Sequence, residues 1–292
     1  RLSDAQQDRF CQFLLRLAKN SRQSLRAMSL EVSESWLRGP CSTDGHNALV
    51  AALVHLVTDR VGSHRHRAAA ALATLGAASS TTEHARSLLA DARPTLLSLT
   101  VDSQVLVRRH ALLAVSAWAC AGDDGDLADM DSRLPRLCLS LAQSDGAASV
   151  RKAALTSVSR LYLRFPANKE VVRAWAHVVA TLTADDDRPV SLLALAELDD
   201  RIFRPLVASA AQPPTYWNAV SELMAPYPIP FFRTALSKRA DNAPASGSMV
   251  DGMILEALHD AATQQRCALR LIAEVVPHVT SLEATGAAPA GG

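Results

Sequence analysis

The chain is poor in the residues on which β-rich folds depend. Its 292 residues include 12 Gly, and aromatic residues make up only 4% of it. β-Sandwiches and barrels rely on aromatic side chains and on turns that contain Gly, so such folds are disfavoured. Hydrophobic residues nevertheless account for 49% of the chain, mainly as Ala, Leu and Val. This composition suits helices that pack on helices, and it predicts an all-α protein.

Neither sign of charge is in excess, because 30 Lys and Arg are balanced by 29 Asp and Glu for a net charge of +1. The balance excludes a polybasic nucleic-acid tail and an acidic disordered segment. Any preference for a partner must therefore come from local patches. Only four of the cations are Lys, and the others are Arg, which suits bidentate contacts with carboxylates and phosphates.

Cysteine is scarce and its spacing does not suit a structural role. The five Cys are an odd number, lie far apart and never form C-x-x-C, which argues against a disulfide framework and a zinc site. We interpret them as reduced thiols of an intracellular protein. The apolar runs are far shorter than the roughly 18 residues that span a bilayer, and no signal peptide opens the chain, so we expect no membrane association.

Motifs of known enzyme classes are also missing. The chain contains no G-x-S-x-G, no Walker-type Gly-rich loop and no H-E-x-x-H. The sequence therefore predicts a protein that is not an enzyme, with no cofactor, no metal and no small-molecule substrate.

What the chain does contain is a repeat. Four segments align without gaps, at 24–36, 63–75, 106–118 and 149–161. Each carries a basic residue at the same position, with spacings of 39, 43 and 43 residues: Arg26, Arg65, Arg108 and Arg151. In three of the four segments an Asp stands six residues before the Arg: Asp59, Asp102 and Asp145. Four gapless copies at near-constant spacing are not expected by chance, so the pattern indicates a repeat protein.

Each repeat predicts two helices. Apolar and small residues follow the repeated Arg at offsets of 3, 4, 7 and 10, which trace one stripe of a helix. A first amphipathic helix precedes it, near 4–18, 46–57, 82–99, 127–141 and 168–182. Ser3 with Gln6, and Asp44, are residue types that begin helices. A weaker fifth copy has Ser191 in place of the Arg, and a sixth fits only through apolar residues between 268 and 275.

Two antiparallel helices every 39 to 43 residues is the period of HEAT and armadillo solenoids, and the D-x-x-x-x-V-R start of the second helix favours HEAT. We therefore expect an all-α HEAT-repeat α-solenoid, a right-handed superhelix of antiparallel helix pairs. About five units fill 1–204, irregular helices continue the solenoid through 205–284, and 285–292 forms a disordered tail. Since no polar capping repeat opens the chain, we expect it to be a piece of a longer array.

The repeated Asp and Arg predict a ladder between repeats. In a stacked solenoid the Arg of one unit can reach the Asp of its neighbour and fix their relative rotation, while the Asp also caps N–H groups of the second helix. We assign this structural role to seven residues: Asp59, Arg26, Arg65, Asp102, Arg108, Asp145 and Arg151.

Other cations flank the ladder arginines and lie off the apolar stripe: Arg22, Arg67, Arg109, His110 and Lys152. We expect them to face solvent at the same end of successive second helices, where the helix dipoles add positive potential. One interpretation is a ridge that follows a phosphate backbone and binds DNA, without sequence preference because phosphate contacts carry no base information. The other is a set of ordinary solvated helix faces, and the sequence leaves both open.

Particular stretches also match the motifs of one protein family. The pattern L-x-x-x-x-x-N-S-x-x-S-x-R spans 14–26, and D-x-x-x-S-V-R-K-x-A-L begins at Asp145. An Ala174-Trp175 pair, an acidic turn at 185–187 and a degenerate A-L-x-x-L-D at 194–199 follow in order. Taken together across 10–202, these motifs resemble the D-type HEAT subunit of condensin II.

That resemblance implies a non-catalytic scaffold and DNA-binding subunit that acts in mitotic chromosome condensation, in the nucleus and on chromosomes. Its implied partners are the kleisin subunit and the SMC ATPases of condensin II, together with DNA or chromatin. The repeat motif by itself is shared by other HEAT scaffolds, so two alternatives stay open: a karyopherin-type transport receptor and a phosphatase-type HEAT scaffold. The near-neutral charge argues against a karyopherin, whose surface is usually acidic.

Overall fold

The computed structural model describes residues 3–37, 42–77, 83–121, 133–205 and 214–224. Within these ranges every regular element is a helix, which confirms the expected all-α class. The chain divides by compactness into two units, Arg1–Arg164 and Phe165–Gly292. Most of the expected 205–284 segment and the whole 285–292 tail lie outside the described residues.

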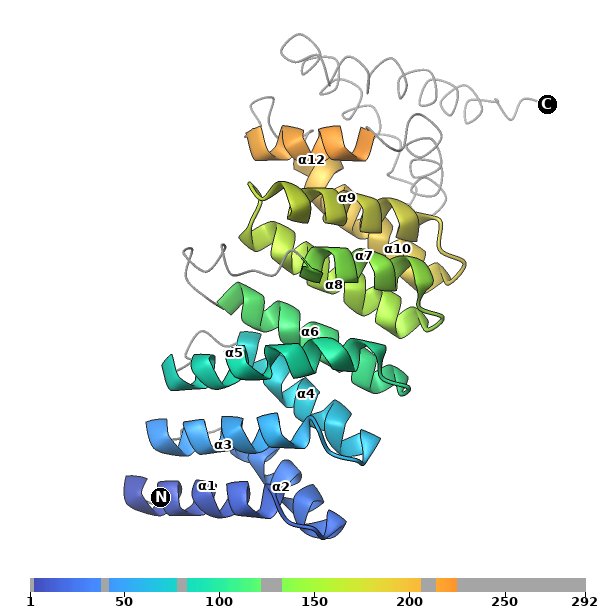
Figure 1. The fold of residues 1–292 in the computed structure, drawn as a ribbon. Coiled ribbons are helices and arrows are strands. Elements are labelled where there is room, and N and C mark those ends of the chain that lie inside the picture. The colour runs from blue at the N-terminus through green and yellow to red at the C-terminus, as the bar shows by residue number, and fades with distance from the viewer. Residues whose placement is uncertain (1–2, 38–41, 78–82, 122–132, 206–213, 225–292) are drawn as a thin grey trace, which may run out of the picture. The chain divides into compact units, whose positions relative to one another are not determined.

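In its described part, the first unit consists of four helix pairs (Figure 1). The helices are α1 (Asp4–Ala18), α2 (Gln23–Trp36), α3 (Thr43–Leu56), α4 (Gly62–Ala77), α5 (Glu83–Ser98), α6 (Val105–Ala121), α7 (Arg133–Ser144) and α8 (Ala148–Arg164), with a 3-10 turn η1 (Leu99–Val101) before α6. First helices stack on first helices, α1 on α3 and α3 on α5, while α4 packs on α6 and α6 on α8. Stacked helix pairs of this kind form an α-solenoid, as the sequence period predicts.

The starts of the helices are set by local capping. α1 begins as expected behind Ser3, which forms a capping box with Gln6. α3 begins differently, because Ser42 and not Asp44 is its cap: Ser42 Oγ accepts a hydrogen bond from Gly45 N–H at 3.2 Å. Asp44 lies instead in the first turn of α3, where its negative charge interacts favourably with the positive end of the helix dipole. The prediction of Asp44 as the cap is therefore wrong.

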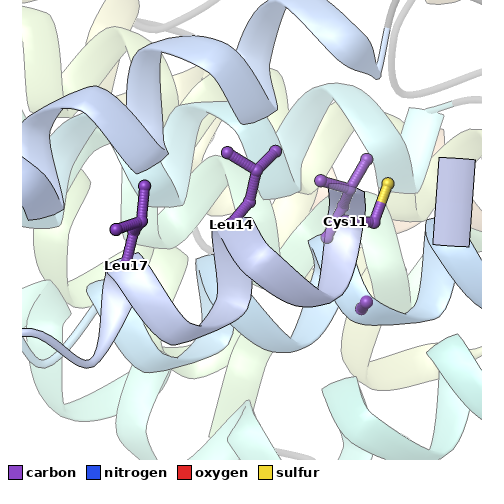
Figure 2. Close-up of a cluster of buried hydrophobic side chains, with 5 residues drawn as sticks. Cys11, Leu14 and Leu17 are labelled. Carbon is purple, nitrogen blue, oxygen red and sulfur yellow. The ribbon is translucent and has the colours of Figure 1, made fainter. Parts of the chain in front are cut away.

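The core between the first two helix pairs is built from small and medium-sized apolar side chains. Figure 2 shows Cys11, Leu14 and Leu17 along one face of α1. They pack with Ala48 and Leu49 of α3, and all five residues are buried. Their spacing of three residues along α1 is the apolar stripe of an amphipathic helix, so burial of this face holds α1 against α3.

The second helices α4 and α6 approach each other closely at Gly76. The indole Nε1 of Trp118 in α6 donates a hydrogen bond to the Leu72 carbonyl of α4 at 2.7 Å. A Cβ atom at Gly76 would lie 2.9 Å from this indole and 3.0 Å from Ala117 Cβ, closer than side chains normally come. The absence of a side chain at Gly76 thus lets the indole of Trp118 lie against the α4 backbone.

The second unit is described for α9 (Lys169–Thr183), α10 (Arg188–Leu198), a π-helical turn η3 (Asp199–Phe203) and α12 (Pro214–Met224). α9 packs against α10 and α12, and its Trp175 is fully buried. In α10, Ser191 stands where other repeats have the ladder Arg, and its Oγ donates to the Thr183 carbonyl at 2.8 Å. None of the helices in the described ranges is long and apolar enough to cross a bilayer.

Candidate functional site

The repeated Arg and Asp form rungs between neighbouring repeats. The guanidinium groups of Arg26, Arg65 and Arg108 each donate through Nε and Nη2 to both carboxylate oxygens of the Asp in the next repeat, which makes a bidentate pair. The two distances are 2.5 and 3.2 Å for Arg26–Asp59, 2.9 and 3.1 Å for Arg65–Asp102, and 2.7 and 2.9 Å for Arg108–Asp145. The rungs therefore join α2, α4 and α6 each to the turn that begins the following second helix.

Each ladder guanidinium is oriented by its own turn. The remaining nitrogen, Nη1, donates to a backbone carbonyl in that turn at these distances: 2.8 Å from Arg26 to Ser21, 2.8 Å from Arg65 to Asp59, 2.9 Å from Arg108 to Asp102 and 2.9 Å from Arg151 to Asp145. The guanidinium is thus held in place before it reaches the next repeat, and little side-chain entropy is lost when the rung forms.

The ladder aspartates also shape the turns in which they stand. Each carboxylate accepts a hydrogen bond from the backbone N–H two residues later, at 2.8 Å from Val61, 2.8 Å from Gln104 and 2.9 Å from Ala147. In the first repeat Asn20 occupies the Asp position and accepts from Arg22 N–H at 2.9 Å in the same way. The neutral amide of Asn20 therefore keeps the turn without supplying a carboxylate for a rung.

The rung between Arg26 and Asp59 is the most buried, with side chains 7% and 2% exposed. Asp59 Oδ2 also contacts the Nδ1 atom of His64 at 3.2 Å. Burial opposes the ionisation of Asp59, but hydrogen bonds from Arg26, Val61 N–H and His64 outweigh it and hold its pKa at about 2. Asp59 is therefore ionised at neutral pH, and the rung is a buried ion pair whose carboxylate is fully hydrogen-bonded.

The other two rungs are closer to solvent, with Arg65 16% and Arg108 18% exposed. Hydrogen bonding to Asp145 raises the pKa of Arg108. Burial works against the charged form of Asp145, yet hydrogen bonds from Arg108 and Ala147 N–H hold its pKa below the ordinary value. The rung between Arg108 and Asp145 therefore stays charged at neutral pH, and water screens both of these rungs more than the first rung.

Arg67 does not face solvent as a free cation. Its side chain extends from α4 to Glu34 of α2, where Nη2 donates to Oε2 at 2.6 Å and Nε donates to Oε1 at 3.2 Å. The hydrogen bond with Glu34 raises the pKa of Arg67, and the side chain is only 37% exposed. The structure therefore pairs Arg67 with Glu34, whereas the sequence predicts a cation that faces solvent.

His110 also departs from the expectation. Its ring is half-buried and stacks on that of His66 in α4, with ring centroids 5.7 Å apart. Burial, with a smaller contribution from the charge of Arg109, lowers the pKa of His110, and burial likewise lowers the pKa of His66. Both imidazoles are therefore neutral at pH 7, and His110 cannot supply positive charge to a phosphate.

The other three flanking cations keep accessible side chains. Arg22 is exposed at the N-cap position of α2, while Arg109 on α6 and Lys152 on α8 are half-buried. The five cations thus do not form the uniform solvent-facing ridge that the sequence predicts. Sequence reasoning also missed the contacts of Glu34 and His64. The sequence gives no indication of the Glu34 contact. For His64 the one indication is that it stands directly before the ladder Arg, where the other three repeats have an apolar residue.

In the described part of the chain, possible metal ligands do not cluster in threes, and two cysteine thiols have raised pKa values. No three His, Cys, Asp or Glu side chains of these residues are close enough to hold a metal ion. Burial raises the pKa of Cys138 to about 12 and that of Cys120 to about 11. Both thiols are therefore protonated at neutral pH and poor nucleophiles.

Comparison with known proteins bears on the fold alone. No protein-family model matches the chain, and no curated protein matches it in sequence. Among solved structures it is similar to the crystal structure of an engineered protein, a target of the Northeast Structural Genomics Consortium, with a TM-score of 0.57 and 18% identity. The match covers 87% of this chain and 96% of the other. At this identity the similarity supports the helical fold and carries no function.

Proposed function

We propose that this chain is a non-catalytic scaffold and DNA-binding subunit of a condensin II-like complex, acting in mitotic chromosome condensation. The observation that carries the scaffold part is the ladder. Three bidentate rungs fix the second helices of successive repeats relative to one another. A surface held in this way is already ordered before a partner binds. The entropy cost of ordering then falls only on the extended partner segment and not on the scaffold.

The condensin II part rests on the ordered motifs between 10 and 202. With it come the proposed partners, a kleisin subunit and SMC ATPases, and the proposed location on chromosomes in the nucleus. The ATP hydrolysis of such a complex belongs to the SMC partners, and this chain contributes contacts.

We assign the DNA contacts to Arg109 and Lys152. These cations occupy the same position, one residue after the ladder Arg, on the successive second helices α6 and α8. Neighbouring packed helices lie about 8–10 Å apart, so the two side chains can contact phosphates along one strand without a bend in the DNA. Arg67 is left out because Glu34 binds both its Nε and its Nη2 atoms, and His110 is left out because burial lowers its pKa.

The salt dependence of duplex DNA binding tests this assignment. The double variant Arg109→Glu with Lys152→Glu should reduce the slope of log K against log salt by about 2, since each phosphate contact contributes about 0.9. Arg9→Glu is the matched control, because Arg9 is an exposed cation of α1 outside the repeated positions. An unchanged slope in the double variant would refute the DNA contacts and leave the scaffold proposal standing.

A further inference from the structure

The turns that precede the second helices form a continuous side of the first unit, which we call the turn edge. It consists of residues 19–22, 57–61, 101–106 and 145–147. Neighbouring turns touch directly: Arg60 Nη2 donates to the Ser21 carbonyl at 3.0 Å. The side chain of Gln104 lies over Gly62, where an added Cβ would be only 2.1 Å from its Oε1. The rung from Arg108 then joins the last turn.

The ladder leaves this edge strongly basic at one end. The turn edge contains three carboxylates, and each accepts a bidentate bond from a ladder arginine: Asp59, Asp102 and Asp145. Three further cations of the edge have no carboxylate partner among the described residues: Lys19, Arg22 and Arg60. All three are exposed, and they lie in two adjacent turns. Their positive charge is therefore uncompensated by the edge itself.

The next turn along the edge exposes three apolar side chains. Val101 is 76% exposed, Val105 37% and Leu106 45%, within a stretch of six residues. The repeat pattern does not explain them, because the residues aligned with Val105 and Leu106 are Gln23 and Ser24 in the first repeat and Ala148 and Ser149 in the fourth. Exposed apolar side chains that gather beside a charged cluster mark interaction sites more often than isolated ones do.

We infer that the turn edge binds an extended peptide segment of a partner protein, with acidic residues on Lys19, Arg22 and Arg60 and a bulky apolar residue on Val101, Val105 and Leu106. The charge of the edge selects an anionic partner. The apolar end favours a peptide over a nucleic acid, whose backbone offers charge without aliphatic side chains. The inference rests on the scaffold part of the proposed function and not on its assignment to condensin II.

The spacing of the turns sets the spacing of the peptide. Packed helices are about 8–10 Å apart, and an extended chain covers about 3.3–3.6 Å per residue. The apolar residue should therefore stand about three residues from the acidic residue on Arg60 and about six from those on Lys19 and Arg22. Because the direction of the peptide is not fixed by this argument, both orders of the two parts must be tested.

The test measures binding of fluorescent synthetic peptides by anisotropy. The probe carries a run of six glutamates, then two leucines, and a second probe has the reverse order. Two control peptides replace the glutamates by glutamines or the leucines by serines. The chain should bind one of the two probes at least about tenfold more tightly than either control peptide, because both halves of the edge contribute.

Variants of the chain locate the contact. Arg22→Glu with Arg60→Glu, and separately Val101→Ser with Leu106→Ser, should each weaken probe binding about tenfold or more. Arg9→Glu and Leu163→Ser are the controls, since Arg9 lies on α1 and Leu163, 55% exposed, lies at the opposite end of α8. All substituted side chains are exposed, so circular dichroism should show the same helix content in every variant.

Two results would overturn the inference. One is equal binding of the probes and the control peptides. The other is binding of a DNA duplex that depends on Arg22 and Arg60 but not on Leu106, which would make the edge a phosphate-binding surface. Failure of the chain to associate with SMC subunits would not affect this test, because no condensin component is present in it.

Discussion

Loss of the buried rung at Asp59 should destabilise the first unit more than loss of any other single charge of the ladder. In Asp59→Asn the turn can keep its bond from Val61 N–H, but Arg26 loses its counter-charge while its side chain is 7% exposed. A buried charge left without its partner costs about 3–5 kcal/mol. Asp102→Asn should cost less, about 1.5–3 kcal/mol, because water reaches Arg65 more easily.

A double-mutant cycle separates the rung from the other contacts of the two residues. Arg26→Met and Asp59→Asn should each be destabilising, whereas the double variant removes both charges together and should recover about 2–3 kcal/mol relative to the sum. Urea unfolding followed by circular dichroism gives the free energies. Asp91→Asn, an exposed carboxylate of α5, is the control and should change stability by less than about 0.5 kcal/mol.

The same rung predicts a pH dependence. The pKa of Asp59 is about 2 in the folded chain, against an ordinary value of 3.8. A depressed folded pKa contributes stability that is present above the unfolded value and is lost as the pH falls, so about 2 kcal/mol should disappear between about pH 5 and pH 2. Asp59→Asn should lack this part of the acid dependence. Additive single substitutions, or an acid profile that Asp59→Asn leaves unchanged, would refute the reasoning.

Three further predictions follow from particular contacts. Gly76→Ala should destabilise the chain by about 1–2 kcal/mol although Ala favours helices, because the added Cβ would lie 2.9 Å from the Trp118 indole. Gly146→Ala is the control: a Cβ there has nothing within 4 Å, so this substitution should be neutral or stabilising by up to about 1 kcal/mol. Thermal unfolding measures both. Glu34→Gln should cost only about 0.2–1 kcal/mol in urea unfolding, since Arg67 is 37% exposed and its pair is screened; a loss above 2 kcal/mol would contradict this. Cys120, with its pKa of about 11, should react with iodoacetamide at pH 8 roughly a hundredfold more slowly than an ordinary thiol. Mass spectrometry of the peptide that contains Cys120 measures this rate. Rapid labelling in the folded chain would contradict the burial of the thiol.

The parts of the structure that repeat in the sequence could be predicted from it. The six-residue separation of Asp145 and Arg151 is a local feature that recurs in three of the four gapless copies, so both the turn and the rung follow from the pattern. The helix pairs follow for the same reason, because one apolar stripe recurs with each ladder Arg. Repetition thus reveals contacts that are made in the same way in each unit.

Contacts made only once could not be predicted. The pair of Arg67 and Glu34 forms because the rotation between α2 and α4 brings two unrelated helix positions together. The stacking of His66 on His110 depends in the same way on how α4 meets α6. Sequence spacing describes the face of one helix and does not give the register of one helix against the next. For this reason the sequence could not show that Arg67 pairs with Glu34 and that His110 stacks on His66 instead of joining the predicted ridge of five cations.

The central claim, that this chain is a scaffold subunit of a condensin II-like complex, is tested most directly by purification of the tagged chain from dividing cells. Quantitative mass spectrometry should recover SMC and kleisin subunits in amounts comparable to the chain itself. The variant Asp91→Asn, which changes an exposed carboxylate of α5 outside the ladder, is the matched control and should recover the same partners. Recovery of Ran and nucleoporins, or of a phosphatase catalytic subunit, with no SMC subunit present would contradict the claim.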